Sequence, residues 1–183
     1  MMYRLINCLA IGILIITAGC PQSEGSEFRN VLFINEFMAA NDSSVVDERG
    51  DYDDWIELYN GGDKTIRLAG MYLTDDFTAI TKWKIPDTTI APGGFLVIWA
   101  DNEVNEGALH ANFKLGAAKG EGVGLYDTDV HDNELIDART FGPQKPDISY
   151  GRYPDGENEW QLFTTPTPGS ANATGRETAP ARK

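Results

Sequence analysis

The stretch Asp47–Asp54 (DERGDYDD) contains the residues of this chain that are best suited to chemistry. It places five carboxylates and one glycine within eight positions. Calcium takes about six to eight oxygen ligands, which clustered carboxylates in a glycine-containing loop can supply. A bound cation would also relieve the repulsion between the carboxylates. The sequence therefore predicts a calcium site formed by Asp47, Asp51, Asp53 and Asp54, with a well-solvated acidic loop as the alternative.

This stretch does not have the pattern of an EF-hand. With Asp47 as the first position, the third is Arg49, and the sixth is Tyr52 where an EF-hand requires glycine. Asp75 and Asp76 follow a predicted strand and could complete the site. Oxygen ligation leaves no sharp sequence signature, so the ligand set is a hypothesis.

The other reactive residue types point away from catalysis. His110 and His131 are the only histidines, and neither has a metal-ligand partner at short spacing, so both are expected at the surface. The chain has no G-x-S-x-G motif and no phosphate-binding glycine loop. Glu36 and Glu57 could contribute to a carboxylate pair for glycoside hydrolysis, but acids are too common here for such a pair to be informative. We therefore expect no enzymatic activity, and an envelope hydrolase is the weakest of three functional hypotheses.

Aromatic side chains offer a second kind of binding surface. Some of the tryptophan and tyrosine rings could be exposed and stack against a sugar or a peptide. A sandwich without disulfides must bury most of its large side chains, so most of these rings are expected in the core. The rings concerned are those of Trp55, Trp83, Trp99, Trp160, Tyr72, Tyr126, Tyr150 and Tyr153.

Charge and cysteine content narrow the classes of partner and of fold. The formal net charge is −13, and such an acidic surface repels nucleic acid at long range, so no nucleic-acid partner is expected. The same surface suits divalent cations. Both cysteines, Cys8 and Cys20, lie near the amino terminus, so the domain has no disulfide and depends on burial for its stability.

The amino terminus has the layout of a secretory signal peptide. A basic start and a mostly apolar run, Leu5–Thr17, are followed by small residues and Cys20. The apolar run is shorter than the roughly 20 residues of a membrane-spanning helix. The small residues before Cys20 resemble a bacterial lipobox, so we expect residues 1–19 to be removed and Cys20 to be lipidated. An ordinary signal peptide cut near Ala18 is the alternative.

A lipidated cysteine would place the protein in the bacterial cell envelope, anchored to a membrane. Pro21 follows Cys20, where lipoproteins held at the inner membrane often have Asp, so the outer membrane is expected if the organism has one. Residues 20–30 are polar and are expected to form a tether between the anchor and the domain. Residues 173–183 are expected to form a disordered tail.

From Val31 onward the sequence predicts short strands separated by turns. Runs of β-branched and aromatic residues alternate with Gly, Pro, Asp and Asn, and no long window has a helical period. Ile56 and Leu58 share one face of their strand, and both faces of Phe95–Ala100 are apolar, which predicts a central strand. The predicted strands are Val31–Phe37, Trp55–Asn60, Thr65–Leu68, Met71–Thr74, Thr81–Ile85, Phe95–Ala100, Asn112–Leu115, Gly122–Asp127, Leu135–Phe141, Ser149–Tyr153 and Trp160–Thr164.

Several sequence blocks occur in a recognisable order. They are INEFMAAN (Ile34–Asn41), DYDDWIELYN (Asp51–Asn60), LAGMYLTDD (Leu68–Asp76), KWKIP (Lys82–Pro86), IAPGGFLVIWAD (Ile90–Asp101), NFKLG (Asn112–Gly116) and the segment Ser149–Asn172. Together they resemble a bacterial lamin-tail domain over about residues 31–172. The resemblance implies a single domain of the all-β class with an immunoglobulin-like β-sandwich, which the strand pattern favours independently.

The resemblance also implies a binding or assembly module. Combined with the amino terminus, it predicts a non-catalytic, lipid-anchored envelope protein whose acidic loop holds calcium and whose partner is an unidentified protein or glycan. The main alternative is a calcium-dependent carbohydrate-binding module. That alternative requires an exposed Trp or Tyr beside the acidic loop.

Overall fold

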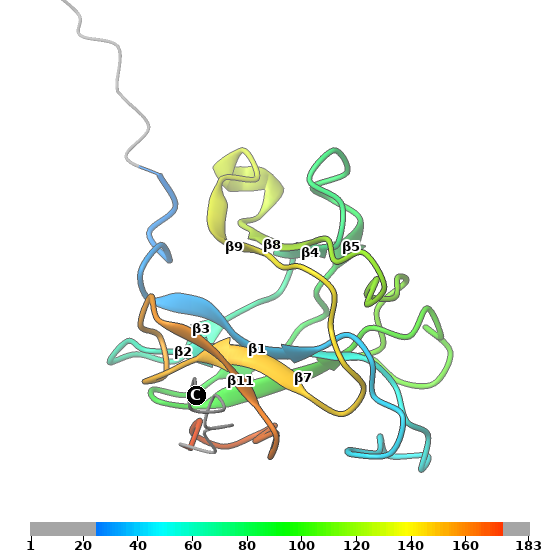
Figure 1. The fold of residues 1–183 in the computed structure, drawn as a ribbon. Helices are drawn as coiled ribbons and strands as arrows, with labels where there is room; N and C mark the ends of the chain where they lie inside the picture. Colours follow the sequence, from blue (N-terminus) through cyan, green and yellow to red (C-terminus); the bar gives the residue numbers. More distant parts are fainter. Residues whose placement is uncertain (1–24, 174–183) are drawn as a thin grey trace, which may run out of the picture.

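The computed structural model describes residues 25–173, which form a sandwich of two main sheets. Figure 1 shows the β9-β8-β4-β5 layer above the layer that contains β1, β2 and β7. The five-stranded sheet has the order β11-β10-β1-β2-β7, the four-stranded sheet has the order β5-β4-β8-β9, and β3 pairs with β6. The strands are β1 (Leu32–Met38), β2 (Trp55–Asn60), β3 (Ile66–Arg67), β4 (Tyr72–Thr74), β5 (Trp83–Lys84), β6 (Thr89–Ile90), β7 (Phe95–Trp99), β8 (Gly122–Tyr126), β9 (Leu135–Thr140), β10 (Ser149–Arg152) and β11 (Trp160–Phe163). The all-β sandwich expected from the sequence is confirmed.

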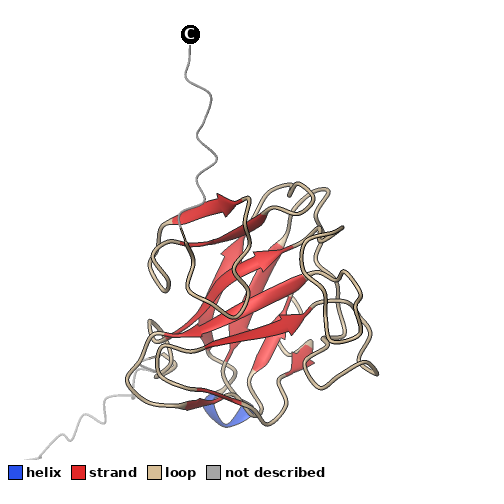
Figure 2. Ribbon diagram, turned by 90° about the horizontal axis from the view of Figure 1, so that it is seen from below, coloured by secondary structure: helices blue, strands red, loops and turns tan. Residues whose placement is uncertain are grey.

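Helix plays almost no part in the described chain. Figure 2 shows a single short helical turn among strands and loops, and this is the 3-10 helix η1 (Asp129–His131). Within residues 25–173, no helix is long and apolar enough to cross a membrane. The expected signal peptide, the lipidation site Cys20 and most of the expected carboxyl-terminal tail lie outside the described residues.

Ten of the predicted strands are present, and three details of the prediction are wrong. The segment Asn112–Leu115 is not a strand, because only Lys114 makes an isolated bridge, to Asp101. The two-residue strand β6 was not predicted. Strand β7 lies at the edge of its sheet and not at the centre, although both of its faces are apolar.

The core lies between the two main sheets and follows the alternation of strand side chains. Ile56 and Leu58 of β2 both point into it, as their shared face predicted, and Ile98 of β7 joins them. The facing sheet contributes Leu73 and Leu125, which are paired across β4 and β8. One continuous cluster of buried apolar side chains therefore joins both layers, as expected for a domain without disulfides.

A β-bulge in β1 turns a glutamate away from this core. The register between β1 and β2 shifts between Ile34 and Glu36, so Ile34 and Phe37 both pack in the core while Glu36 pairs with Glu57 on the other face. Bulges of this kind re-aim side chains locally. Two glutamates thus lie side by side on the outer face of the sheet, and both are fully buried.

The carboxyl-terminal segment covers these two glutamates. We call residues 164–172 the strap, and Figure 1 shows it in orange and red beneath the five-stranded sheet. Thr167 donates from its backbone and its hydroxyl to Glu36, and the backbone N–H of Gly169 donates to Glu57 at 2.6 Å. Each carboxylate oxygen of the pair therefore accepts a hydrogen bond, Asn35 and Ser149 supplying the remaining donors.

Glycine at position 151 lets the strap approach the sheet. A Cβ atom at Gly151 would lie 2.9 Å from the carbonyl oxygen of Asn35 and 3.0 Å from Nδ2 of Asn172. That Nδ2 donates to the carbonyl oxygen of Arg152 at 2.7 Å, which fixes the end of the strap. A side chain at position 151 would therefore push the strap away.

Arg152 pairs with an acid between the two main sheets. Its guanidinium contacts Asp137 at 2.9 Å and also donates to the carbonyl oxygen of Ile34 at 2.8 Å. The ring of Trp160 lies against the same guanidinium. This buried pair joins β1 and β10 to β9 of the other sheet, so its role is structural.

The chain before β1 already contacts the domain. The Ser26 hydroxyl donates to Asp127 at 2.5 Å, and Phe28 packs against the core. These two residues fall within the expected tether of residues 20–30. The part of the chain between Cys20 and the first fixed residue is therefore short.

Burial of the glutamate pair makes stability depend on pH. Burial raises the pKa of Glu57 to about 8, although hydrogen bonds from Asn35 and Gly169 act in the opposite direction. Burial also raises the pKa of Glu36. The folded protein therefore retains a proton that the unfolded chain releases near the usual glutamate pKa.

We predict that the free energy of unfolding falls as pH rises, because the folded state binds this proton more tightly than the unfolded chain does. Stability from Glu57 is complete below about pH 4.5 and is lost as pH approaches 8, by on the order of 3 kcal/mol, because the folded state binds more protons in that window. In the Glu57→Gln variant, the unfolding free energy from urea titrations should differ much less between pH 5 and pH 8 than it does in the parent protein. The same pH dependence of unfolding free energy in the variant and in the parent protein would contradict the role given to Glu57.

Candidate metal centre

The first acidic loop, residues 41–54, is folded around the carboxylate of Asp47. Its Oδ1 accepts hydrogen bonds from the backbone N–H groups of Arg49, Gly50 and Asp51, each at 2.8 Å. Burial tends to raise the pKa of Asp47, but these donors and nearby His110 bring it below its usual value. Oδ2 of Asp47 is buried and has no hydrogen-bond partner among the described residues. One oxygen thus holds the loop and the other is free to bind a ligand.

Asn41 fixes the base of the first acidic loop. Its side-chain oxygen accepts from the N–H groups of Ser44 and Val45, and its Nδ2 donates to the carbonyl oxygen of Asp53 at 2.8 Å. Asp147 ties the start of the loop by accepting from Ser43. The position of Asp53 is therefore set by a buried side chain and not by the loop alone.

The second acidic loop, residues 101–110, follows β7 and returns to its free edge. The N–H of Trp99 donates to the carbonyl oxygen of Leu109 at 2.9 Å, and the N–H of Ala111 donates to the carbonyl oxygen of Trp99 at 2.8 Å. Asp101 is fully buried and accepts from the N–H of Glu103 at 2.8 Å. This pairing covers the edge of β7 and sets the second loop beside the first.

His110 is buried and not at the surface, which corrects the sequence prediction. It is 1% exposed, with Nδ1 hydrogen-bonded to Asp101 and Nε2 at 3.1 Å from Oε1 of Glu48. Burial opposes the imidazolium form, but the two carboxylates raise the pKa of His110 above its usual value. His131 has an exposed side chain as expected, next to Asp127.

The two loops bring their carboxylates together in two overlapping groups. The ligand atoms of Asp53, Glu103 and Glu106 lie within 4.8 Å of one another, as do those of Asp47, Glu106 and His110. Glu106 belongs to both groups. Oδ2 of Asp53 and Oε2 of Glu106 are also buried without a partner among residues 25–173. Buried acceptors without donors are costly, and a cation bound within either group would satisfy the free oxygens of that group.

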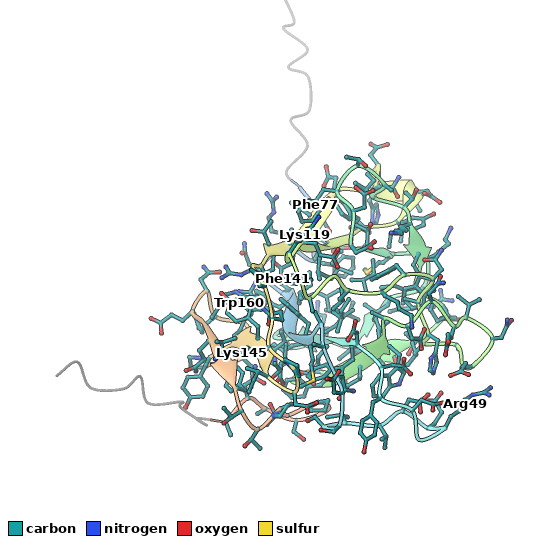
Figure 3. The ribbon with its side chains drawn as sticks, turned by 45° about the vertical axis from the view of Figure 1, so that its right-hand side comes forward. Arg49, Phe77, Lys119, Phe141, Lys145 and Trp160 are labelled. Carbon is teal, nitrogen blue, oxygen red and sulfur yellow. The ribbon has the colours of Figure 1, made fainter. Side chains whose placement is uncertain are left out.

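A positive side chain partly offsets this charge from outside. Arg49 lies at the tip of the first loop in Figure 3, at 3.7 Å from Glu106, and donates to backbone oxygens of the second loop. Burial raises the pKa of Asp53, and the charge of Asp101 raises it further. The carboxylates of the two groups therefore outnumber the cationic side chains that contact them.

Of the four calcium ligands predicted from the sequence, two lie in these groups and two do not. Asp47 and Asp53 face the second loop, as described above. Asp51 is exposed, and Asp54 accepts from the backbone N–H of Asn41, so neither belongs to the two groups. Burial raises the pKa of Asp54 to about 6.

Four further acids bear on the ligand prediction, two that the sequence suggested and two that it did not. Asp75 forms a salt bridge with Lys82, and Asp76 accepts a hydrogen bond from the hydroxyl of Thr78, so both have partners outside the two groups. Glu103 and Glu106 were not predicted, because their loop approaches the first one only through the fold. The signal was the acid-rich segment DNEVNEG after the strand of Phe95–Trp99.

An open polar cavity borders the first acidic loop. Its volume is about 310 Å³, and Tyr52, Asp53, Asp54 and Lys114 contribute to its lining. The side chain of Tyr52 is 49% exposed. The tryptophans, by contrast, are buried or partly buried, as most of the aromatic residues were expected to be. One exposed ring therefore lies beside the acidic residues.

Comparison with protein families identifies a match for most of the chain. A family model described as the Lamin Tail Domain matches residues 27–143, a range that contains both acidic loops and the strands β1 to β9. No curated protein and no solved structure matches the chain. The glutamate pair lies within the matched range, whereas β10, β11 and the strap follow it.

Proposed function

Because the chain belongs to the lamin tail domain family, whose fold is an immunoglobulin-like β-sandwich, we propose that it is a non-catalytic binding and assembly module of the bacterial cell envelope. In this proposal a lipid on Cys20 anchors the module to a membrane, and calcium braces its two acidic loops. The partner is a protein or a glycan, and nucleic acid is not a partner.

The observation that carries the calcium proposal is the convergence of the two loops. Asp53, Glu103 and Glu106 supply an oxygen-only group, and two of them have buried oxygens without a partner in the described chain. Carboxylate oxygens are the ligands that calcium prefers. The third free oxygen, Oδ2 of Asp47, lies in the neighbouring group with Glu106 and His110, and Asp51 and Asp54 are outside both groups. A calcium ion would remove the repulsion among these groups and fix both loops as a surface for a partner.

The envelope address rests on the amino-terminal sequence and on the short distance from Cys20 to the domain. Ser26 and Phe28 are already held by the domain, so only a few residues of the expected tether separate Cys20 from it in the sequence. A short tether would hold the sandwich close to the membrane surface.

A calcium-dependent carbohydrate-binding module is a second candidate. The observation in its favour is Tyr52, an exposed ring on the first acidic loop that lines the polar cavity with Asp53 and Lys114. Aromatic rings with neighbouring carboxylates are suited to sugar rings and their hydroxyl groups. The hydrolase hypothesis gains less support, because the buried pair of Glu36 and Glu57 lies under the strap, where a substrate has no access.

We predict that calcium stabilises the purified mature chain. At a free calcium concentration of about 100 times the dissociation constant, stability should rise by about 2.7 kcal/mol, which calorimetry would detect as a higher thermal midpoint than in EDTA. Asp53→Asn and Glu103→Gln should abolish the increase, and Asp51→Asn should keep it. A midpoint that is the same in calcium and in EDTA would remove the calcium proposal.

We predict that lipid attachment depends on Cys20. Cells that express the parent chain should incorporate labelled palmitate into it and retain it in the membrane fraction, whereas Cys20→Ser should abolish incorporation. Unchanged labelling of Cys20→Ser, or a parent chain released without label, would show that the amino terminus is processed in another way.

The carbohydrate hypothesis predicts binding to glycans that depends on both calcium and Tyr52. A glycan array should show bound sugars whose signal disappears in EDTA and in Tyr52→Ala, with Phe77→Ala as a control for loss of another exposed ring. Binding that survives in Tyr52→Ala would exclude the cavity as its site.

A further inference from the structure

We propose that Asp47, Glu106 and His110 form a second metal position, one that binds a transition-metal ion such as Zn²⁺ through a nitrogen ligand, with Glu48 as the fourth ligand. The ligand atoms of the first three residues lie within 4.8 Å of one another. Glu48 is added because its Oε1 lies 3.1 Å from Nε2 of His110. The proposal depends on the geometry of the two loops and not on calcium binding.

The contacts of His110 favour a metal at Nε2. Asp101 is fully buried and hydrogen-bonded to Nδ1, so Nε2 is the ring nitrogen that faces the cluster and can bind a metal in exchange for its proton. A carboxylate behind a histidine is the usual outer partner of histidine ligands to zinc. Asp101 is thus a positioning residue for the metal ligand His110.

The distance between His110 and Glu48 fits a shared ion. A lone pair on Nε2 and a carboxylate oxygen repel each other at 3.1 Å unless a proton or a metal lies between them. Two ligands of a tetrahedral zinc ion, each at about 2.0 Å, are separated by about 3.3 Å. The pair is therefore spaced as two corners of such a site.

Two oxygens in the same group have no hydrogen-bond partner in the described part of the chain. Asp47 is 7% exposed, and because its Oδ1 accepts three backbone hydrogen bonds, only Oδ2 remains as a ligand. Oε2 of Glu106 is also buried without a partner in the described part of the chain. These atoms supply negative charge and free lone pairs beside Nε2.

The backbone around the group leaves no room for it to collapse. A Cβ atom at Gly107 would lie 2.6 Å from Oε1 of Glu48 and 2.8 Å from Cδ2 of His110. The pairing of Leu109 and Ala111 with Trp99 holds His110 from both sides. His110 is therefore positioned by the fold before a metal arrives, whereas the side chain of Glu48 is more than half exposed.

Ligand chemistry separates this position from the calcium site. Imidazole nitrogen suits zinc and other late transition metals, whereas calcium prefers oxygen alone. The group of Asp53, Glu103 and Glu106 has only oxygen ligands, and it shares Glu106 with the nitrogen-containing group. The loops would thus present two neighbouring positions of different selectivity, bridged by one glutamate.

The test is metal binding by the mature chain after EDTA treatment and dialysis. Isothermal titration should show one Zn²⁺ per chain, and Co²⁺ should give the visible absorption of a four-coordinate site. His110→Gln should abolish the Co²⁺ absorption and keep the calcium-dependent rise in thermal midpoint. Asp101→Asn should weaken Zn²⁺ binding by about 10- to 100-fold, and Asp51→Asn should bind as the parent chain does.

A measurement on the unaltered chain avoids any effect of these variants on folding. Nitrogen-detected NMR should show Zn²⁺ shifting the Nε2 resonance of His110 and leaving that of His131, an exposed histidine, unchanged. No Co²⁺ absorption in the parent chain, or a His110 resonance that Zn²⁺ does not move, would overturn the proposal. Loss of calcium binding alone would not affect it.

Discussion

The candidate site depends on one short piece of backbone pairing, between Trp99 at the end of β7 and the segment of Leu109 and Ala111. This pairing covers an edge that would otherwise expose unpaired backbone groups. It also carries Asp101, Glu106 and His110 to the first acidic loop. Without it, the second loop would be a solvated excursion and the carboxylates of the first loop would face water.

Two sets of crowded carboxylates occur in the domain, and their hydrogen bonds distinguish them. The pair of Glu36 and Glu57 is fully buried, yet each oxygen accepts a hydrogen bond from the strap or a neighbouring strand. In the loops, by contrast, Asp47, Asp53 and Glu106 each have a buried oxygen without a donor among residues 25–173. A satisfied network rigidifies a fold, whereas an unsatisfied one requires an explanation. For this reason we assign a structural role to the glutamate pair and propose the loops as the site for a cation.

The sequence predicted the parts of the molecule that depend on local pattern. Strand β2 was predicted with its exact bounds, because Ile56 and Leu58 alternate with polar or aromatic residues. The edge position of β7 was not predictable, because apolar residues on both faces are typical of a central strand and its neighbours are set by the fold. His110 was placed wrongly for the same reason, since its buried partner Asp101 becomes a neighbour only through backbone pairing. Half of the predicted calcium ligands converge with the second loop, and the others do not, because loop direction is not encoded in residue spacing.

The most direct test of the proposed calcium site is a crystal structure of the mature domain grown with calcium. We predict a calcium ion between the two acidic loops, at about 2.4 Å from carboxylate oxygens of Asp53, Glu103 and Glu106. Ordered water in that position, with the three carboxylates turned apart toward solvent, would contradict it. Such a result would leave the lamin-tail sandwich intact and reduce the loops to a solvated surface.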